Sequence, residues 1–308
     1  MEKKAHILVM TFNLAASDVP LDAFSFLPKG YDMYILGFQE VGPFIPLACD
    51  AKQNALSQIL ETKFEKEYFI MTNMTMLGLK LFIAVKKEHE KYVWANNEYF
   101  IPTGADGAYG NKGAVAVSIN YDQTKILFIC AHFAAHEKAI LDRNRNYSDI
   151  MTKIISYSGC DPREMHNFIF FFGDLNYRID LSYDDAKRLS MAGMYPNLIL
   201  YDQLQRERTS IHVFSGFSEE EITFPPTYKF DKDSMLYDTS KKERVPSYCD
   251  RILFFANSRK TLTVNSYTSY MDVMFSDHRP VVADFTFDLV DKLEVQKSTE
   301  KSSRVCRI

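Results

Sequence analysis

Short apolar segments that end in polar residues recur along the chain, and Phe168–Phe172 shows the pattern most clearly. This segment stops at Gly173, and Asp174, Asn176 and Arg178 follow it. A continuous apolar run of β-favouring residues with a glycine at its end is typical of a strand buried on both faces. The pattern therefore predicts a strand inside a sheet. The polar residues after it either lie at a strand end, where α/β sheets bind ligands, or simply form a turn.

The same pattern predicts the other elements of the chain. Apolar positions at helical spacing predict helices over Pro46–Phe64, His136–Tyr157, Tyr183–Met191 and Asn197–Arg208. The strands between residues 68 and 132 follow one another closely and are expected to pair antiparallel. Short β-favouring runs between turn residues predict strands over Ile7–Leu14, Met33–Phe38, Tyr68–Thr75, Leu79–Lys86, Val93–Ile101, Ala114–Asn120, Lys125–His132, Tyr248–Phe255, Thr261–Tyr267 and Pro280–Phe287.

The segment Gly216–Val245 interrupts this pattern with paired prolines and many charges. It is expected to be an irregular loop outside the core, and a loop this long in a compact domain is usually functional or disordered. No repeat or linker divides the chain. Residues 1–293 are therefore expected to form one domain, followed by a flexible, weakly basic tail over residues 294–308.

Composition and charge disfavour several classes of protein. The 308 residues are 46% hydrophobic, enough for one large core, and the net charge of -4 gives no overall positive field for a nucleic-acid backbone. The five cysteines are scattered and form no C-x-x-C pair, which fits a reducing compartment. No apolar run approaches the roughly 18 residues of a membrane span, and the apolar N-terminal stretch is broken too early for a signal peptide. A soluble, cytoplasmic protein is expected.

Polar side chains stand at the end of almost every predicted strand. If the strands share a sheet, these side chains converge on one edge of it. They include carboxylates, carboxamides and imidazoles but no thiol, a set that suits a hard cation such as Mg²⁺ rather than zinc. With basic residues on adjoining loops, the set predicts metal-assisted hydrolysis of a phosphoester. The strand-end residues are Asn13, Glu40, Asn111, Lys112, His132, Asp174, Asn176, Asp250, Arg251, Asp277 and His278.

Three blocks of the sequence resemble the signature blocks of the inositol polyphosphate 5-phosphatases. They are F-F-G-D-L-N-Y-R at Phe171–Arg178, R-V-P-S-Y-C-D-R-I-L at Arg244–Leu253 and S-D-H-R-P-V at Ser276–Val281. Supporting matches, among them G-F-Q-E at Gly37–Glu40 and P-P-T-Y-K-F at Pro225–Phe230, occur in the family's order. The resemblance covers nearly the whole chain.

The resemblance implies both a fold and an activity. The fold is a DNase I-like four-layer α/β sandwich, in which two mixed β-sheets pack face to face with helices on the outside. The activity is Mg²⁺-dependent removal of the 5-phosphate from phosphoinositides, such as phosphatidylinositol 4,5-bisphosphate or 3,4,5-trisphosphate, or from soluble inositol polyphosphates. A nuclease of the DNase I-like or abasic-site kind would use the same metal core and remains an alternative.

The resemblance also implies roles for particular residues. The implied metal ligands are Glu40, with Asn13 and Asp277 in or near the shell of the ion. Asp174, helped by Asn176, would orient and deprotonate the attacking water.

Other residues would contact the phosphates of the substrate. His278, paired with Asp250, would bind an oxygen of the scissile phosphate, and His132 would supply a further donor. Specificity for a 4-phosphate beside the 5-phosphate would come from the T-Y-K loop and from basic residues before P-S-Y-C-D-R. The implied substrate-binding residues are Asn111, Lys112, Tyr228, Lys229, Lys242 and Arg244.

Simpler interpretations of some of these residues stay open. Asp250 could form a structural salt bridge with Arg251, and Lys242 and Arg244 could belong to a solvated charge run. Arg178 is expected to support a loop rather than to touch substrate.

The catalytic blocks do not distinguish a lipid substrate from a soluble one. Methionines in Met71–Leu81 would contact acyl chains if they are exposed, or they are the ends of core strands. We expect transient contact with the cytosolic face of a membrane, no nucleic-acid partner and a monomeric protein. Cys306 lies one place too late for a prenylation motif.

Overall fold

The computed structural model describes residues 4–43, 46–104, 109–257 and 261–290. The expected tail over residues 294–308 lies outside these residues, so the domain boundary at residue 293 stays a prediction. In the described part of the chain, no helix is long and apolar enough to cross a membrane.

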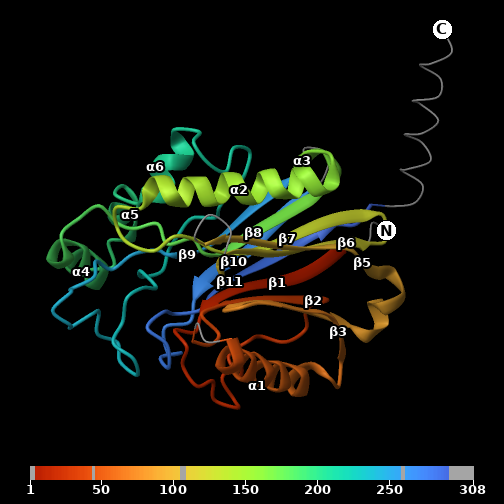
Figure 1. Ribbon diagram of the computed structural model, residues 1–308, viewed down its shortest axis with the longest axis horizontal. Coiled ribbons are helices and arrows are strands. Elements are labelled where there is room, and N and C mark those ends of the chain that lie inside the picture. The colour runs from red at the N-terminus through yellow and green to blue at the C-terminus, as the bar shows by residue number, and fades with distance from the viewer. Residues whose placement is uncertain (1–3, 44–45, 105–108, 258–260, 291–308) are drawn as a thin grey trace, which may run out of the picture.

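Two β-sheets form the centre of the molecule (Figure 1). One has five strands in the order β5 (Val93–Gly104), β6 (Tyr109–Tyr121), β7 (Thr124–His132), β8 (Phe168–Asp174) and β9 (Asp250–Ala256). The other has six strands in the order β10 (Leu262–Ser269), β11 (Val281–Asp288), β1 (Lys4–Asn13), β2 (Met33–Gln39), β4 (Leu79–Lys86) and β3 (Tyr68–Met76).

Helices cover the outer faces of the two sheets, so the molecule has the four layers that the resemblance implied. Helix α1 (Pro46–Phe64) lies below the six-stranded sheet and α2 (Ile140–Ser158) lies above the five-stranded sheet (Figure 1). The inner faces pack together through buried side chains such as Val9, Val115 and Phe170. The remaining helices are the 3₁₀ helix η1 (Lys87–Tyr92), α3 (Pro162–Met165), α4 (Tyr183–Met191), α5 (Tyr195–Ile199) and α6 (Gln203–Thr209).

The pairing of the strands brings their polar ends to one end of the molecule. β1 and β2 are parallel, which sets Asn13 opposite Gln39. β7 and β8 are also parallel, so His132 lies opposite Asp174, and the antiparallel strand β9 begins with Asp250 opposite the same aspartate. β8 is buried throughout and lies between β7 and β9, as its apolar pattern predicted.

Gly173 makes the exit from β8 possible. Its φ is +148°, and a Cβ atom at this position would lie 1.9 Å from the carbonyl oxygen of Ala131. Only glycine avoids that collision with the neighbouring strand. The strand therefore reaches Asp174 in close contact with β7.

Two predictions about the second half of the chain are wrong. The single helix over Asn197–Arg208 is two helices, because Asp202 leaves helical geometry and caps α6 by accepting a hydrogen bond from the Gln205 N–H. The segment Gly216–Val245 is irregular, as expected, but it belongs to the core. Its buried aromatic residues include Phe217, Phe224, Tyr228, Phe230 and Tyr237.

The methionines of Met71–Leu81 are mainly packing residues. Met74 is 4% exposed and belongs to the core between the sheets, and Met71 and Met76 are half-buried against the same core. The structure therefore favours the core interpretation of this segment over membrane contact.

Candidate active site

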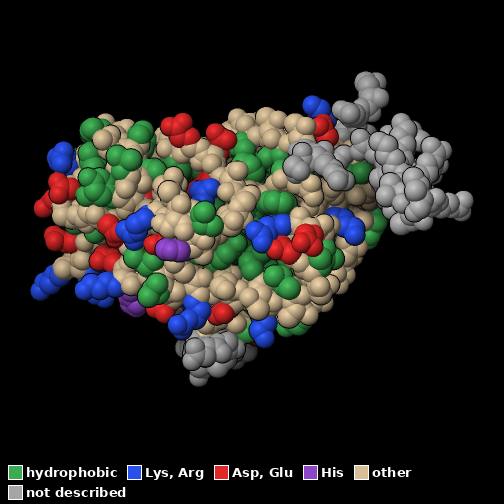
Figure 2. All heavy atoms as spheres, turned by 90° about the horizontal axis from the view of Figure 1, so that it is seen from above, with side chains coloured by type: hydrophobic (Ala, Val, Ile, Leu, Met, Phe, Trp, Pro, Cys, Tyr) green, Lys and Arg blue, Asp and Glu red, His purple; other side chains and the backbone are tan. Residues whose placement is uncertain are grey.

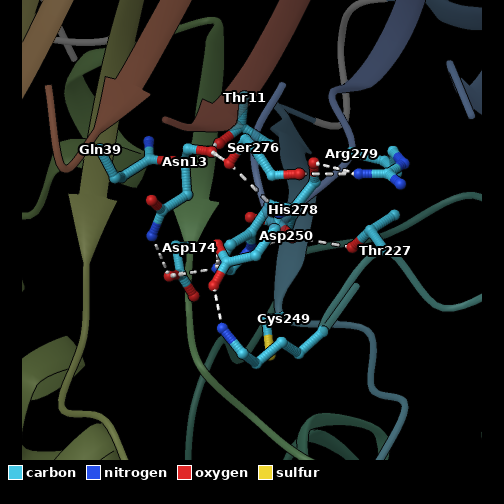
Figure 3. A network of polar contacts seen from close by, with 12 residues as sticks. Thr11, Asn13, Gln39, Asp174, Thr227, Cys249, Asp250, Ser276, His278 and Arg279 are labelled. Atoms are coloured by element: carbon cyan, nitrogen blue, oxygen red, sulfur yellow. Dashed lines mark hydrogen bonds and ion pairs between the residues drawn. The ribbon is translucent and has the colours of Figure 1, made fainter. Parts of the chain in front are cut away.

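Asp174 lies at the centre of a polar cluster where the two sheets meet (Figure 3). Its Oδ2 accepts a hydrogen bond from Asn13 Nδ2 at 2.8 Å and lies 3.3 Å from His132 Nε2, and its Oδ1 accepts the Asn176 N–H at 3.0 Å. Burial raises the pKa of Asp174, but the hydrogen bond from His132 and the positive charges around it outweigh burial and hold that pKa well below its usual range. The carboxylate therefore stays ionised as a hydrogen-bond acceptor.

His132 and Lys112 form one side of the cluster. His132 is buried, and burial together with the charge of Lys112 lowers its pKa, so the imidazole is neutral at pH 7. Lys112 Nζ lies against the imidazole, with Nδ1 at 3.4 Å, and burial lowers the pKa of this lysine as well. His132 Nε2 also lies 3.7 Å from Oε1 of Glu40, which connects Glu40 to the cluster.

His278 and Asp250 form the opposite side. His278 Nδ1 donates to Asp250 Oδ2 at 2.9 Å, and Thr227 Oγ1 donates to the same oxygen at 2.7 Å. Burial opposes the charged imidazole, but Asp250 and then Asp174 raise the pKa of His278 to about 9. The imidazolium therefore presents Nε2 toward Asp174, at 4.0 Å. Arg251 is not the partner of Asp250, because it pairs with Asp202 and Glu219.

Asn176 is held from several directions. Its backbone lies in the left-handed region with a φ of +56°, its Nδ2 donates to the Phe133 carbonyl at 3.2 Å, and its Oδ1 accepts from Arg178 at 2.6 Å. The Arg178 guanidinium also lies 4.4 Å from the centre of the Tyr228 ring. Arg178 therefore supports the loop, as expected from the sequence. One N–H of the Asn176 carboxamide remains for a water or a substrate oxygen.

Oxygen atoms at the edge of the cluster fit a hard divalent cation. Glu40 supplies a carboxylate that is 35% exposed, whereas Asn13 has both ends of its carboxamide engaged, with Asp174 and with the Ala15 N–H. Asp277 joins the cluster through His278 Nε2, at 3.9 Å, and forms an ion pair with Lys229. His278 and Lys229 lower the pKa of Asp277 against the effect of burial.

A second set of side chains is close enough to share an ion but is chemically less suitable. The ligand atoms of Asp174, Asp250 and His278 all lie within 4.8 Å of one another. However, Nδ1 of His278 is bonded to Asp250, and the raised pKa keeps this ring protonated, so it has no free lone pair for a metal. The buried thiol of Cys249 also stays protonated, because burial raises its pKa. Glu40 is therefore the better principal ligand.

The predicted substrate-binding residues divide into two groups. Lys229, Lys242 and Arg244 line a cavity of about 540 Å³ beside Asp277, and Arg244 also pairs with Asp238 at 3.4 Å. Tyr228 is instead 9% exposed, and the centre of its ring lies 4.6 Å from the centre of the His278 ring, so it packs against the histidine. The side chain of Asn111 lies outside the described residues.

Two buried hydroxyl residues of the site had no role assigned from sequence. Thr227 fixes Asp250, and Ser276 Oγ donates to the Asn13 carbonyl at 2.7 Å while accepting the His278 N–H at 3.2 Å. Both lie inside the motifs P-P-T-Y-K-F and S-D-H-R-P-V. In the sequence, the signal that could have identified them was their position next to residues with assigned roles.

Comparisons with known proteins agree with this geometry. Residues 10–284 match the model of the endonuclease/exonuclease/phosphatase family 2. The chain is 35% identical, in an alignment of 295 residues that covers 89% of this chain, to the type II inositol 1,4,5-trisphosphate 5-phosphatase of Mus musculus. It is 39% identical over 228 residues, which cover 74% of this chain, to the synaptojanin of Caenorhabditis elegans. It spans only 28% and 20% of those two proteins.

A solved structure is similar over the whole chain. It is the inositol polyphosphate 5-phosphatase domain of spsynaptojanin in complex with inositol (1,4)-bisphosphate and calcium ion. The TM-score is 0.80 with 30% sequence identity, and the match covers 100% of this chain and 94% of that one.

The pairing of Asp250 with His278 predicts a measurable change in ionisation. In Asp250→Asn the carboxylate that most stabilises the imidazolium is gone, so the pKa of His278 should fall from about 9 to about 7 or below. NMR of ¹³C-labelled histidine measures this, with His278→Gln identifying the resonance. Asp272→Asn changes an exposed aspartate nearby and should leave the pKa as it is. An unchanged His278 pKa in Asp250→Asn would contradict the assignment.

Proposed function

Since the chain belongs to the endonuclease/exonuclease/phosphatase family 2 and, within it, to the inositol polyphosphate 5-phosphatases, we propose that it hydrolyses the 5-phosphate of phosphoinositides. The observation that carries the proposal is the ionised, hydrogen-bonded Asp174 between a neutral His132 and a protonated His278, next to a basic cavity. Relatives named as inositol 5-phosphatases favour this activity over the nuclease alternative.

A divalent cation is part of the proposed reaction. An oxygen-rich set, with Glu40 as the principal ligand and Asn13 and Asp277 as further candidates, suits Mg²⁺, and the related spsynaptojanin domain is in complex with inositol bisphosphate and calcium ion. When bound, the ion would neutralise phosphate charge and polarise the phosphorus–oxygen bond that breaks.

The residues of the chain supply the remaining chemistry. Asp174 orients the attacking water and accepts its proton as the water oxygen bonds to phosphorus. The bond from phosphorus to the 5-oxygen of the ring breaks, and the ring oxygen takes up a proton from solvent and leaves as a hydroxyl. The protonated His278 donates to a non-bridging phosphate oxygen from one side. Lys112 and His132 stabilise the negative charge of the phosphate from the opposite side of the cluster. A 1,4-bisphosphate, as in the spsynaptojanin complex, is what a 1,4,5-trisphosphate becomes when it loses its 5-phosphate.

The proposed reaction leads to a direct test. The chain should release inorganic phosphate from 4,5-bisphosphorylated and 3,4,5-trisphosphorylated inositol lipids with Mg²⁺ but not with chelator. Asp174→Ala should lower kcat by about 10²- to 10⁴-fold, because the water loses its acceptor. Asp184→Ala, an exposed aspartate on α4, is the control and should retain activity. Absence of release by the unsubstituted chain, with Asp174→Ala equally inert, would refute the proposal.

The cavity beside Asp277 suits a second phosphate on the ring. Its lining contains five basic side chains (Lys229, Lys232, Lys241, Lys242, Arg244) against three acidic ones (Asp231, Asp238, Asp277). The acidic groups are engaged, Asp277 by Lys229, Asp238 by Arg244 and Asp231 by Thr239. Among the described residues, Lys242 has no ion-pair partner. We assign this cavity to the 4-phosphate of the substrate.

A variant of Lys242 tests this assignment. In Lys242→Ala, loss of one charged hydrogen bond should raise KM about tenfold for a 4,5-bisphosphorylated substrate. The KM for a substrate with only the 5-phosphate should stay the same. Lys153→Ala, an exposed lysine on α2, is the matched control. Equal effects of Lys242→Ala on both substrates would contradict the assignment.

A hairpin next to the cavity favours a lipid substrate over a soluble one. The Asp231 N–H donates to the Leu236 carbonyl at 2.9 Å and closes a turn. Met235 and Leu236, on its return side, are 52% and 57% exposed. Lys232, Lys241 and Lys242 surround the cavity that this hairpin borders. Adjacent apolar and basic side chains are suited to a bilayer with anionic head groups. The face seen in Figure 2, over α2 and α6, instead has acidic and basic side chains interspersed.

A variant of the hairpin distinguishes a lipid from a soluble substrate. The double variant Met235→Ser, Leu236→Ser should lose about tenfold or more in activity on vesicles of long-chain substrate, since two apolar side chains no longer enter the bilayer. Activity on a short-chain soluble substrate should not change. The exposed pair Leu141→Ser, Tyr157→Ser on α2 serves as control. Parallel losses on both substrates, or none on vesicles, would remove the basis for membrane contact by this hairpin.

A further inference from the structure

Glu40 has an unusual backbone conformation for a residue that would bind a cation. It follows β2 with a φ of +49°, in the left-handed region that residues other than glycine seldom adopt. Such a conformation persists only where surrounding contacts hold it. The question is therefore which contacts fix Glu40.

The turn between β3 and β4 holds Glu40 from one side. The N–H of Val41, the next residue, donates to the Gly78 carbonyl at 3.1 Å. A Cβ atom on Gly78 would lie 3.5 Å from the Cα atom of Glu40, so this turn is in contact with the Glu40 backbone itself. On the other side, the Glu40 carbonyl accepts the Ala16 N–H at 2.8 Å.

Gln53 of α1 fixes that turn. Its side chain is 4% exposed, and its Nε2 donates to the carbonyl oxygens of Leu77 and of Leu79, the latter at 3.4 Å. These two carbonyls flank Gly78. Leu77 also has a positive φ, of +45°, so the turn shares the need for external support. One buried carboxamide thus links the helix to both sides of the glycine that touches Glu40.

The segment after Glu40 packs directly on the same helix. A Cβ atom on Gly42 would lie only 2.9 Å from the Cα atom of Cys49, one helical turn before Gln53. Val41, which lies between Glu40 and Gly42, is 1% exposed. Residues 40–42 are therefore held between α1 and the turn that α1 supports.

We propose that Gln53 is a positioning residue that fixes the Glu40 carboxylate for the divalent cation, an inference that rests on the proposed function. Gln53 itself touches neither ion nor substrate. It acts through the Leu77–Leu79 turn, which fixes the backbone from which the Glu40 side chain projects. Loss of its two hydrogen bonds frees that turn and weakens the hold on the ion, while the residues around Asp174 keep their own contacts.

The test uses Gln53→Met, which keeps the length of the side chain and removes both donors. Mn²⁺ binding to the full chain without substrate is followed by electron paramagnetic resonance. The dissociation constant should rise about tenfold, as is usual when a group that orients a metal ligand is lost. The Mg²⁺ concentration for half-maximal phosphate release should rise in parallel, with kcat at saturating Mg²⁺ nearly unchanged. Gln58→Met, at an exposed position of α1, is the matched control, and Glu40→Gln is the reference for loss of the ligand.

The outcomes distinguish this inference from the proposed function. Mn²⁺ binding equal to that of the unsubstituted chain in Gln53→Met, or undiminished binding in Glu40→Gln, overturns the inference even if 5-phosphate is released. Weakened Mn²⁺ binding in a chain that releases no 5-phosphate supports the positioning and refutes the proposed function. If Gln53→Met does not fold, Gln53→Asn is measured in the same way, because the shorter carboxamide stays polar but does not reach both carbonyl oxygens. Unchanged binding in Gln53→Asn would overturn the inference.

Discussion

The buried carboxylate of Asp174 sets the condition that the rest of the site meets. Asp174 and Asp250 are each 1% exposed, and an ionised carboxylate removed from water costs several kcal/mol unless partners replace the lost hydration. Asn13, His132 and the Asn176 N–H satisfy Asp174. His278 and Thr227 both bond to Oδ2 of Asp250, whose Oδ1 has no hydrogen-bond partner among the described residues. Each partner comes from a different strand end or loop. The site therefore forms only when both sheets are folded and packed against each other.

Buried arginines keep the connecting loops in place around this cluster. Arg251 pairs with Asp202 and Glu219 and so attaches the 216–245 segment to β9. Arg143 and the Arg178 backbone share the Gln203 carboxamide oxygen, which ties α2 to the loop after β8. These contacts explain why segment 216–245, which has no regular secondary structure, is packed against the rest of the protein. They also leave the Lys241–Lys242 region exposed next to the catalytic cluster, so a fixed centre adjoins an accessible basic cavity.

The two zones of the site suit different tasks. The cluster around Asp174 is buried and held by hydrogen bonds, which suits the proposed role of orienting one water. The cavity lined by Lys229, Lys242 and Arg244 is open and charged, which suits recognition of phosphates that take no part in the reaction. Asp277 and Lys229 connect the zones through their ion pair. Glu40, the proposed principal ligand of the cation, lies on the other side of the cluster, 3.7 Å from His132.

The sequence by itself determined the strands, most of the helices and the identity of the polar residues at strand ends, because these depend on local periodicity and composition. The motifs also supplied the family and, with it, the layered fold. Tertiary structure decided what local patterns cannot express. Asp250 pairs with His278, 28 residues away, rather than with the adjacent Arg251, because neighbours in a strand point to opposite faces. Met74 belongs to the core, Tyr228 packs against His278, and Gln53 acts on Glu40 through a turn. Each of these contacts joins segments that meet only in the folded chain.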